Sequence, residues 1–504
     1  MSISKTIFTV TGITLLSRLL SLVSLQVYMA FFGPQGTLIN IYAYALSMPN
    51  IIFNVVGTII TAVVVPIYSG LLSTNKDEAS AFINNIMTLV AIGVALLVAI
   101  GMVGAPFLAS ITDFPDHSTQ FLIYSLRVMM FAMFFYGMHY IFQGILHSHS
   151  KFMLVAFVTV PTSTIVISYV LLFGNTFGVP GLLYATVFGL SLQAALLWPA
   201  VRKVGVRYKP TLNLRNPNIR NAMALSVPIL LSVASFQVNT IFNNTLATRF
   251  NLVAIMGYVQ NLMLVLILSI IYSITGVYLP RLTKIWENEQ QNFKTELENV
   301  LITVLLIIVP AAFGFYRMRF EIINLLAGWG NFDHQSVLIA SQMLGLYGFG
   351  IVGIGLKEVL DRAFFAQKNT KISGLVGLLI TVINITFSLT FINHLGFATM
   401  PISFAISTSL GSLILIITMH KKVAIVTPRL TLNIVKIFVA SYTMFICTTA
   451  FKALATTLWT DTPLLDRTLA LALPALGGIL TYTAAIIILR VDGVAPMLKK
   501  LTKR

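Results

Sequence analysis

Charged residues are scarce in this sequence, since only 9% of its 504 residues are Asp, Glu, Lys or Arg, while 57% are hydrophobic. A soluble domain usually carries about 25% charged residues, so this balance excludes an ordinary soluble protein. The apolar residues gather in repeated runs long enough to cross a bilayer as helices, unlike the short alternating strands of an outer-membrane barrel. We therefore expect an all-α polytopic membrane protein.

Cysteine and acidic residues are also rare. The single cysteine, Cys447, lies in an apolar run, which excludes a disulfide framework and a cysteine-based metal site. No Ser/His/Asp, paired-carboxylate or metal-ligand spacing is recognisable, and we expect no enzyme. The 15 acidic residues face 32 basic ones, giving a net charge of +17. The basic residues concentrate in alternate loops, a pattern typical of membrane topology rather than of nucleic-acid binding, so we expect no nucleic-acid partner.

The apolar runs predict about fourteen transmembrane helices. Because the loops after even-numbered spans are the basic ones, both termini are expected to face the cytoplasm. The first run is too long for a signal-peptide core and is expected to remain as a helix. The predicted spans are approximately 7–32, 39–71, 82–112, 119–147, 152–174, 179–201, 221–249, 252–280, 297–316, 337–366, 372–393, 397–419, 432–457 and 465–489.

The chain repeats itself. ITAVVVP at 60–66 matches ITGVYLP at 274–280, and residues 137–151 run parallel to 355–371, each ending in a polar segment with a lysine. Two six-helix halves in the same orientation follow, and parallel repeats of this kind generally hold a substrate site near the membrane midplane. We divide the chain into an N-terminal lobe (1–203), a cytoplasmic linker (204–220), a C-terminal lobe (221–422) and two extra helices with a basic tail (423–504). The extra helices could cover one flank, serve as an assembly surface or line a lipid-facing groove.

Arg18 lies near the middle of the first span. A guanidinium at this depth costs roughly 2.5 kcal/mol or more, so it normally faces protein or a wet cavity. One interpretation is that Arg18 only snorkels or pairs with a neighbouring helix. The other is that it meets an anionic ligand in a cavity.

Two further spans contain unusual polar residues. Pro49 in the second span lacks an N–H and is expected to kink or loosen the helix, either against a neighbouring helix or beside a cavity. In the seventh span, Asn239 and Asn243 share a face, and Gln237 lies nearby. Such amides can hydrogen-bond sugar hydroxyls, but they also join transmembrane helices at roughly 1 kcal/mol each.

A charge cluster ends the tenth span. Lys357 and Asp361, and likewise Glu358 and Arg362, are four residues apart, so the cluster can neutralise itself on the helix. The alternative is that Glu358, Asp361 and Arg362 take part in proton coupling or gating. Weaker candidates are Arg127 and His139 in the fourth span, whereas we interpret His147 and His149 as loop residues.

The sequence resembles the MurJ (MviN) family of lipid II flippases, in the multidrug/oligosaccharidyl-lipid/polysaccharide exporter superfamily. The resemblance rests on SRLL at 17–20, FFG at 31–33, MPN at 48–50, VVVPIY at 63–68, KFMLVAF at 151–157, QVNTIF at 237–242, GVYLPRLTK at 276–284, WGNF at 329–332 and DRAFFAQKNTKIS at 361–373. Their order covers essentially the whole chain.

The resemblance implies alternating-access transport of a polyprenyl-(pyro)phosphate-linked saccharide, most simply lipid II, across a bacterial inner membrane. The head group would pass through a cationic cavity while the lipid tail stays in the bilayer. Arg18 matches the family's cavity arginine, whose fork of donors suits a pyrophosphate. The other expected substrate contacts are Asn40, Asn54, Gln237, Asn239 and Asn261. Expected partners are membrane lipids and cell-wall synthesis proteins.

Several family positions differ here, which keeps two alternatives open: a flippase for another lipid-linked oligosaccharide, and a cation-coupled exporter of amphipathic small molecules. No cofactor is expected, and the energy source would be sodium, protons or the membrane potential. Asn384 matches a polar position implicated in sodium binding in some relatives. Where the family has arginines or acids, this chain has Ser24, Asn40, Phe53, Asn261 and Leu264.

Overall fold

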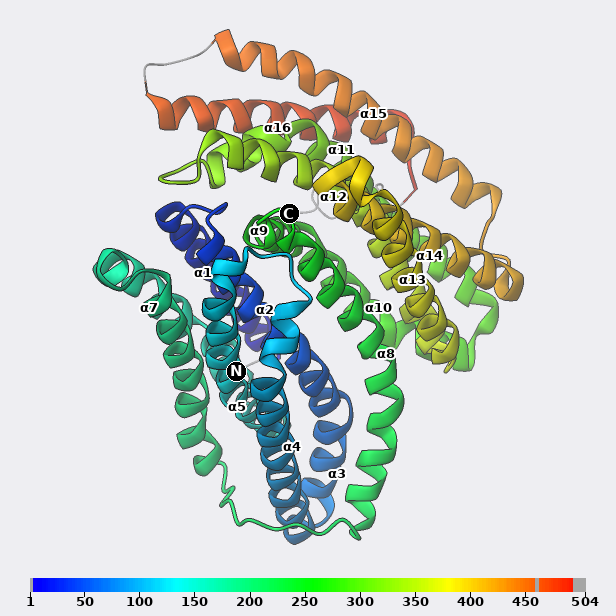
Figure 1. Cartoon of the computed structure of the whole chain (residues 1–504). Helices are drawn as coiled ribbons and strands as arrows, with labels where there is room; N and C mark the ends of the chain where they lie inside the picture. Colours follow the sequence, from blue (N-terminus) through cyan, green and yellow to red (C-terminus); the bar gives the residue numbers. More distant parts are fainter. Residues whose placement is uncertain (1–2, 458–461, 493–504) are drawn as a thin grey trace. The chain divides into compact units, whose positions relative to one another are not determined.

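The computed structural model describes residues 3–457 and 462–492, and this part of the chain is helical with no strand (Figure 1). Side chains are described from residue 12 onward, apart from those of 52–53, 228–229, 231–232, 235, 277, 456–457 and 463. The chain forms two compact units. The first contains Met1–Tyr258 with Gly330–Phe332, and the second contains Val259–Trp329 with Asp333–Arg504.

The first unit contains eleven helical elements, the last of which continues into the second unit. They are α1 (Ile3–Phe32), α2 (Thr37–Ile59), η1 (Ile60–Val64), α3 (Val65–Thr74), α4 (Lys76–Ser110), η2 (Asp116–Ser118), α5 (Thr119–Ser148), α6 (Phe152–Phe157), α7 (Val160–Lys203), α8 (Pro217–Thr248) and α9 (Val253–Met263).

The second unit continues with nine elements. They are η3 (Leu264–Leu268), α10 (Ser269–Asn288), α11 (Gln290–Leu326), α12 (His334–Ala366), α13 (Thr370–Leu395), η4 (Gly396–Ala398), α14 (Thr399–Val423), α15 (Pro428–Thr457) and α16 (Pro463–Ile488).

Eleven helical stretches among the described residues are long and apolar enough to cross a membrane. Two of them, Phe152–Lys203 and Thr370–Val423, have 52 and 54 residues, about twice what one crossing needs. Each is broken at a glycine with positive φ, Gly178 or Gly396, so each is long enough for two crossings. Helix α8 includes residues whose side chains lie outside the described set and is not among the eleven, and the exact count of fourteen spans stays a prediction.

The internal repeat is confirmed by the residues that adopt the left-handed conformation. Four of them recur in the second half after 218 or 219 residues: Gly33 with Asn251, Ser150 with Lys368, Gly178 with Gly396, and Gly205 with Ala424. The ends of α5 and α12 have the same hydrogen bonds, since Lys151 N donates to Leu146 O (2.8 Å) and Asn369 N to Phe364 O (2.9 Å). This is the Schellman arrangement that satisfies the last carbonyls of a helix.

The second and eighth predicted spans share another local feature, a five-residue π-helix: η1 follows α2, and η3 follows α9. Helix α2 runs through Pro49 to Ile59 without interruption, and the expected kink or loosening of the helix at Pro49 stays a prediction. The π-helix η1 ends at Val64, two residues before Pro66, which has no N–H for the usual i to i−4 bond.

The first unit places α8 beside α2, where Tyr44 and Thr245 hydroxyls lie 3.2 Å apart. The connection from α7 to α8 (Figure 1) forms hydrogen bonds with α4. Lys209 N donates to Asn84 Oδ1 (3.1 Å), and Asn213 N donates to Asn85 Oδ1 (3.2 Å). The compact unit therefore extends past residue 203, where the sequence repeat divides the chain. The lobe boundaries drawn from the repeat stay a prediction.

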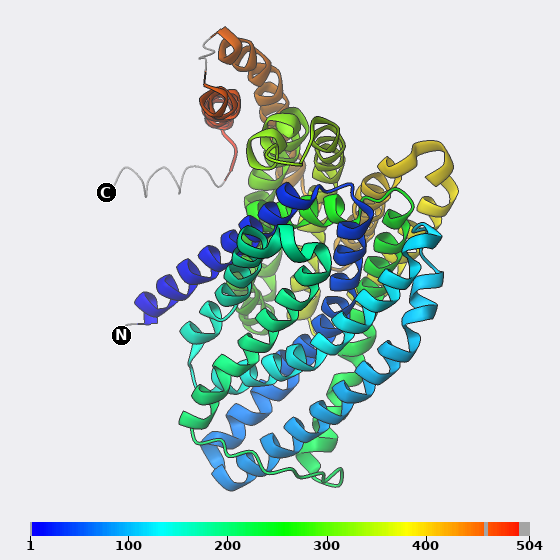
Figure 2. The same ribbon diagram turned by 60° about the vertical axis from the view of Figure 1, so that its left-hand side comes forward.

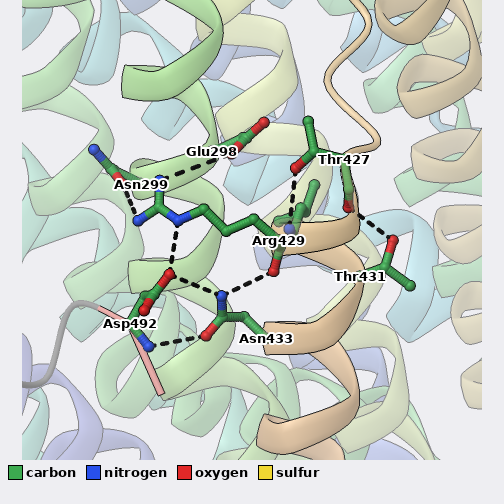
Figure 3. Close-up of polar contacts among 8 residues, drawn as sticks. Glu298, Asn299, Thr427, Arg429, Thr431, Asn433 and Asp492 are labelled. Carbon is green, nitrogen blue, oxygen red and sulfur yellow. Dashed lines mark hydrogen bonds and ion pairs between the residues drawn. The ribbon is translucent and has the colours of Figure 1, made fainter. Parts of the chain in front are cut away.

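In the second unit, α11 packs on α12, and α15 and α16 form a hairpin against α11. Arg429, in the first turn of α15, holds the two ends of this hairpin together (Figure 3). Its Nε lies 2.7 Å from Asp492 Oδ2, beyond the end of α16, and its Nη2 donates to Asn299 Oδ1 of α11 (3.2 Å). Asn433 adds a bond from Asp492 N (2.8 Å).

Candidate functional site

Two serines of α1 near Arg18, Ser17 and Ser21, contact neighbouring segments of the first unit. Ser17 Oγ lies 2.8 Å from Ile13 O and 2.9 Å from Ala156 O, and one turn later Ser21 Oγ lies 3.2 Å from Ser163 Oγ of α7. Figure 2 shows α1 running beside α7 (Figure 2). Arg18 is the residue after Ser17 in the sequence, and it is half-buried.

Helix α5 presents a polar stripe to the same region. His139, Gln143 and His147 are spaced four residues apart, so they lie along one side of an otherwise apolar helix. All three, together with Arg18, line a cavity of about 420 Å³. Its remaining lining residues are Thr14, Ser17, Phe152, Val155, Ala156 and Thr159.

The cavity is suited to an anionic or hydroxylated group. Its ten lining residues include one arginine, two histidines and no acid. His139 is 94% buried, and its Nδ1 has no hydrogen-bond partner in the described part of the chain. Leaving a buried polar nitrogen unpaired costs about 1–3 kcal/mol, so a ligand that bonds it would recover this cost.

The amides that we expected around the head group lie elsewhere. Asn40 is fully buried and bonded to backbone: its Nδ2 donates to Pro34 O and Gly36 O (both 2.9 Å), and its Oδ1 accepts from Ala254 N (3.0 Å). In this conformation Asn40 joins the start of α2 to α9. It contributes nothing to the Arg18 cavity.

The other predicted amides are spread over three helices. Asn54 is exposed on α2. Gln237 and Asn239 are buried on α8, where Asn239 Oδ1 accepts from Asn243 (2.9 Å). Asn261 lies on α9 in the second unit. None of these lines the Arg18 cavity, and their contact with a substrate stays a prediction.

The residues that replace the family's charges are equally dispersed. Ser24 is buried on α1, and Leu264 begins η3. The Phe53 side chain lies outside the described residues.

The charge cluster on α12 forms the two pairs expected from its spacing. Lys357 bonds Asp361, and Arg362 bonds Glu358 with both Nε (2.9 Å) and Nη2 (2.7 Å). Asp361 is buried and also accepts from Ser373 of α13. The self-neutralised arrangement is therefore the one present, while a role in proton coupling stays a prediction.

Asn384 lies in a fully buried polar group between α13 and α14. Its Nδ2 donates to Ser403 Oγ (3.0 Å), which also accepts from Ser388 Oγ (2.9 Å). No group of three or more His, Cys, Asp and Glu side chains suitable for a metal occurs among the described residues. Sodium binding at Asn384 stays a prediction.

Sequence reasoning missed Gln143 and misplaced His147. His147 lies in the last turn of α5 rather than in a loop, and only the spacing of 139, 143 and 147 could have revealed the stripe. His149 does follow the helix, and burial, together with the nearby charge of Lys151, lowers its pKa.

Comparison with known proteins gives a consistent result. Residues 29–465 match the family described as Lipid II flippase MurJ, so Arg18 lies before the matched region. The chain is 24% identical to the lipid II flippase MurJ of Burkholderia cenocepacia, over 84% of both chains.

Two solved structures show the fold. The structure entitled "Lipid II flippase MurJ, inward closed conformation" superposes with a TM-score of 0.78 at 20% identity, covering 95% of this chain and 98% of that one. An inward-facing multidrug resistance MATE family transporter of the MOP superfamily gives 0.69 at 14% identity, covering 81% and 94%.

Proposed function

The chain belongs to the lipid II flippase MurJ family, and from this premise we propose that it moves lipid II from the inner to the outer leaflet. It does so by alternating access, without chemical change to the lipid. The proposed topology places both termini in the cytoplasm of a bacterium, as the basic loops indicate.

The observation that carries the proposal is the Arg18 cavity. A half-buried guanidinium without an acid among the lining residues favours an anion, and a guanidinium fork fits phosphate oxygens. His139, Gln143 and His147 add ring nitrogens and an amide on one side of α5. We assign Arg18 to the pyrophosphate and this stripe to the neighbouring polar atoms of the head group.

An apolar groove supports a lipid substrate. It measures about 520 Å³ and lies in the second unit between α11, α12, α14 and α15, and Thr431 is the only polar residue among those that line it. Of the three roles open for the two extra helices, the groove favours the lipid-facing one. We place part of the polyprenyl chain there.

The alternative of a cation-coupled exporter needs an ionisable acid deep in a lobe. Glu358 and Asp361 are the acids nearest to that description, and both are engaged in ion pairs. Another lipid-linked oligosaccharide would use the same cationic cavity, so only a substrate test separates it from lipid II.

The test is survival of bacteria depleted of their own lipid II flippase and supplied with this chain. We expect the unaltered chain to support growth and Arg18→Ala to abolish it at equal membrane levels. Arg18→Lys should retain part of the activity, because the charge stays while the fork of donors is lost. Arg215→Ala, which removes an exposed arginine from the connection between α7 and α8, is the control and should grow normally.

Two results would speak against these assignments. Full growth with Arg18→Ala would remove Arg18 from the substrate site. Failure of the unaltered, membrane-inserted chain to support growth would favour another polyprenol-linked substrate.

A further inference from the structure

A second charged cavity lies in the second unit, where α11, α15 and α16 meet. It measures about 610 Å³, within the range of about 300–1,000 Å³ that is typical of small-molecule sites. Five charged residues line it: Arg317, Glu321, Lys452, Asp466 and Arg467. A smaller adjoining cavity of about 200 Å³ shares Arg317 and Lys452 and adds Arg319.

The two acids of this cavity form no ion pair with its arginines in the described part of the chain, and they leave its five charged residues with a net charge of +1. Glu321 pairs with Lys452 at 2.6 Å. Arg317 Nη2 donates to the hydroxyl of Thr449 (2.7 Å), and Arg467 donates to the carbonyl of Gly328. In the described part of the chain neither arginine forms an ion pair. Arg317 Nε is buried and makes no hydrogen bond there, so a donor remains for a ligand.

Aromatic rings hold the guanidinium groups in place. Arg317 lies over Phe445 at 5.6 Å, and Arg467 lies over Trp329 at 4.8 Å. Stacking on one face fixes the plane of a guanidinium and leaves its edge free to bond. Thr449 and Asn324 provide neutral polar groups, and the wall is completed by Phe320 and small apolar residues.

The cavity lies at the end of the membrane spans rather than in their middle. The backbone of α11 leaves helical geometry at Met318 (φ −107°, ψ 16°), between Arg317 and Arg319, and α16 begins at Pro463. Tryptophan and arginine at the end of a span are typical of the interface where lipid phosphates lie. In the proposed topology this is the outer face.

We propose that this cavity binds a phosphate group through Arg317 and Arg467, with the phosphate carried by an anionic membrane lipid or free in solution. The arginine edges supply the charge-assisted donors that phosphate oxygens accept. The apolar wall accommodates the glycerol portion of a lipid. The proposal concerns a site separate from the Arg18 cavity, so it stands or fails independently of flipping.

The test uses the full-length chain purified in neutral detergent, with bound lipid counted by native mass spectrometry. We expect phosphatidylglycerol to bind at least about tenfold more tightly than diacylglycerol, which lacks the phosphate group, as expected for charge-assisted bonds. The double variant Arg317→Gln/Arg467→Gln should lose this preference. Arg249→Gln removes an exposed arginine from the end of α8 and should keep it.

A competition measurement identifies the source of the phosphate. If millimolar inorganic phosphate or pyrophosphate displaces phosphatidylglycerol, the site takes free phosphate; if neither does, the ligand is the lipid. Equal binding of the two lipids by the unaltered chain, without displacement of either by phosphate, would overturn the proposal. So would a folded double variant that keeps the preference. The lipid comparison on the unaltered chain decides even if the double variant does not fold.

Discussion

His139 on α5 and Lys357 on α12 occupy equivalent positions in the two halves of the molecule, each eleven residues before the left-handed residue that ends its helix. By the same count Gln143 corresponds to Asp361. In the first half both residues line the Arg18 cavity. In the second half Lys357 and Asp361 form an ion pair with each other. Equivalent backbone positions therefore have different side-chain arrangements in the two halves.

The ion pair of the second half should contribute to stability. Asp361 would keep the hydrogen bond from Ser373 but lose its charged partner, and Lys357 is partly exposed, so we expect Lys357→Met to lower the free energy of unfolding by about 1–3 kcal/mol. Lys368→Met, which breaks an exposed pair with Glu287, should cost less than about 1 kcal/mol. Thermal unfolding of the purified variants measures both.

The double variant Lys357→Met/Asp361→Leu adds a test of proton coupling. It should recover most of the stability, because no buried charge is left unpaired. If Asp361 carries a coupled proton, growth of flippase-depleted bacteria will fail although the protein is stable. Normal growth would show that the Lys357–Asp361 pair has a structural role and carries no coupled proton.

Replacing His139 should separate stability from function. His139→Phe removes a buried nitrogen that has no partner but also the side-chain hydrogen bond with Gln143, so we expect thermal stability to change by less than about 1 kcal/mol. The same change should impair growth in the complementation assay, because the cavity loses one polar contact. A variant that is less stable and fully active would contradict the assignment.

Low pH should weaken the connection between α15 and α16. The hydrogen bond from Arg429 holds the pKa of Asp492 below its usual range, so Asp492 contributes stability above its unfolded pKa of about 4. This contribution is lost as the pH falls through the lower, folded pKa. Since both side chains are 43% exposed, we expect less than about 1 kcal/mol.

Melting temperatures between pH 3 and pH 7 would show this effect. Asp492→Asn should be slightly less stable than the unaltered chain at pH 7, and the difference should shrink as the pH falls below about 4. A difference that is constant over this range would show that the carboxylate charge is not involved.

Replacing the glycine that interrupts α7, or the one between α13 and α14, should lower the stability of the protein. Gly178 (φ 58°, ψ −152°) and Gly396 (φ 55°, ψ −138°) adopt a conformation that is essentially restricted to glycine. We expect Ala at either position to cost about 1–3 kcal/mol, measured by thermal unfolding. Gly93→Ala in α4, a helical position with open space around it, should be neutral or stabilising.

The sequence predicted those features that depend on composition and local spacing. The all-helical membrane fold, the repeat and the paired charges of α12 follow from hydropathy, similarity and a spacing of four residues, and all are present. Arg18 was identified because a guanidinium at mid-span needs an explanation.

The neighbours of Arg18 could not be predicted, because they depend on how α1 packs against α6 and α7, which in turn pack against α5. Asn40 illustrates the same limit. An amide in a transmembrane helix suggests a cavity, but here the turn at Pro34–Gly36 and the start of α9 take up its hydrogen-bonding groups. Polarity identified the residue, and only the packing showed what it bonds.

The left-handed positions that recur in the two halves allow each half to guide stabilising substitutions in the other. At two of them one half has glycine and the other does not: Gly33 corresponds to Asn251, and Gly205 corresponds to Ala424. Because glycine adopts this conformation with the least strain, each half shows where the other retains a less favourable residue. A stabilised variant for biochemical work can thus be designed by comparing the molecule with itself.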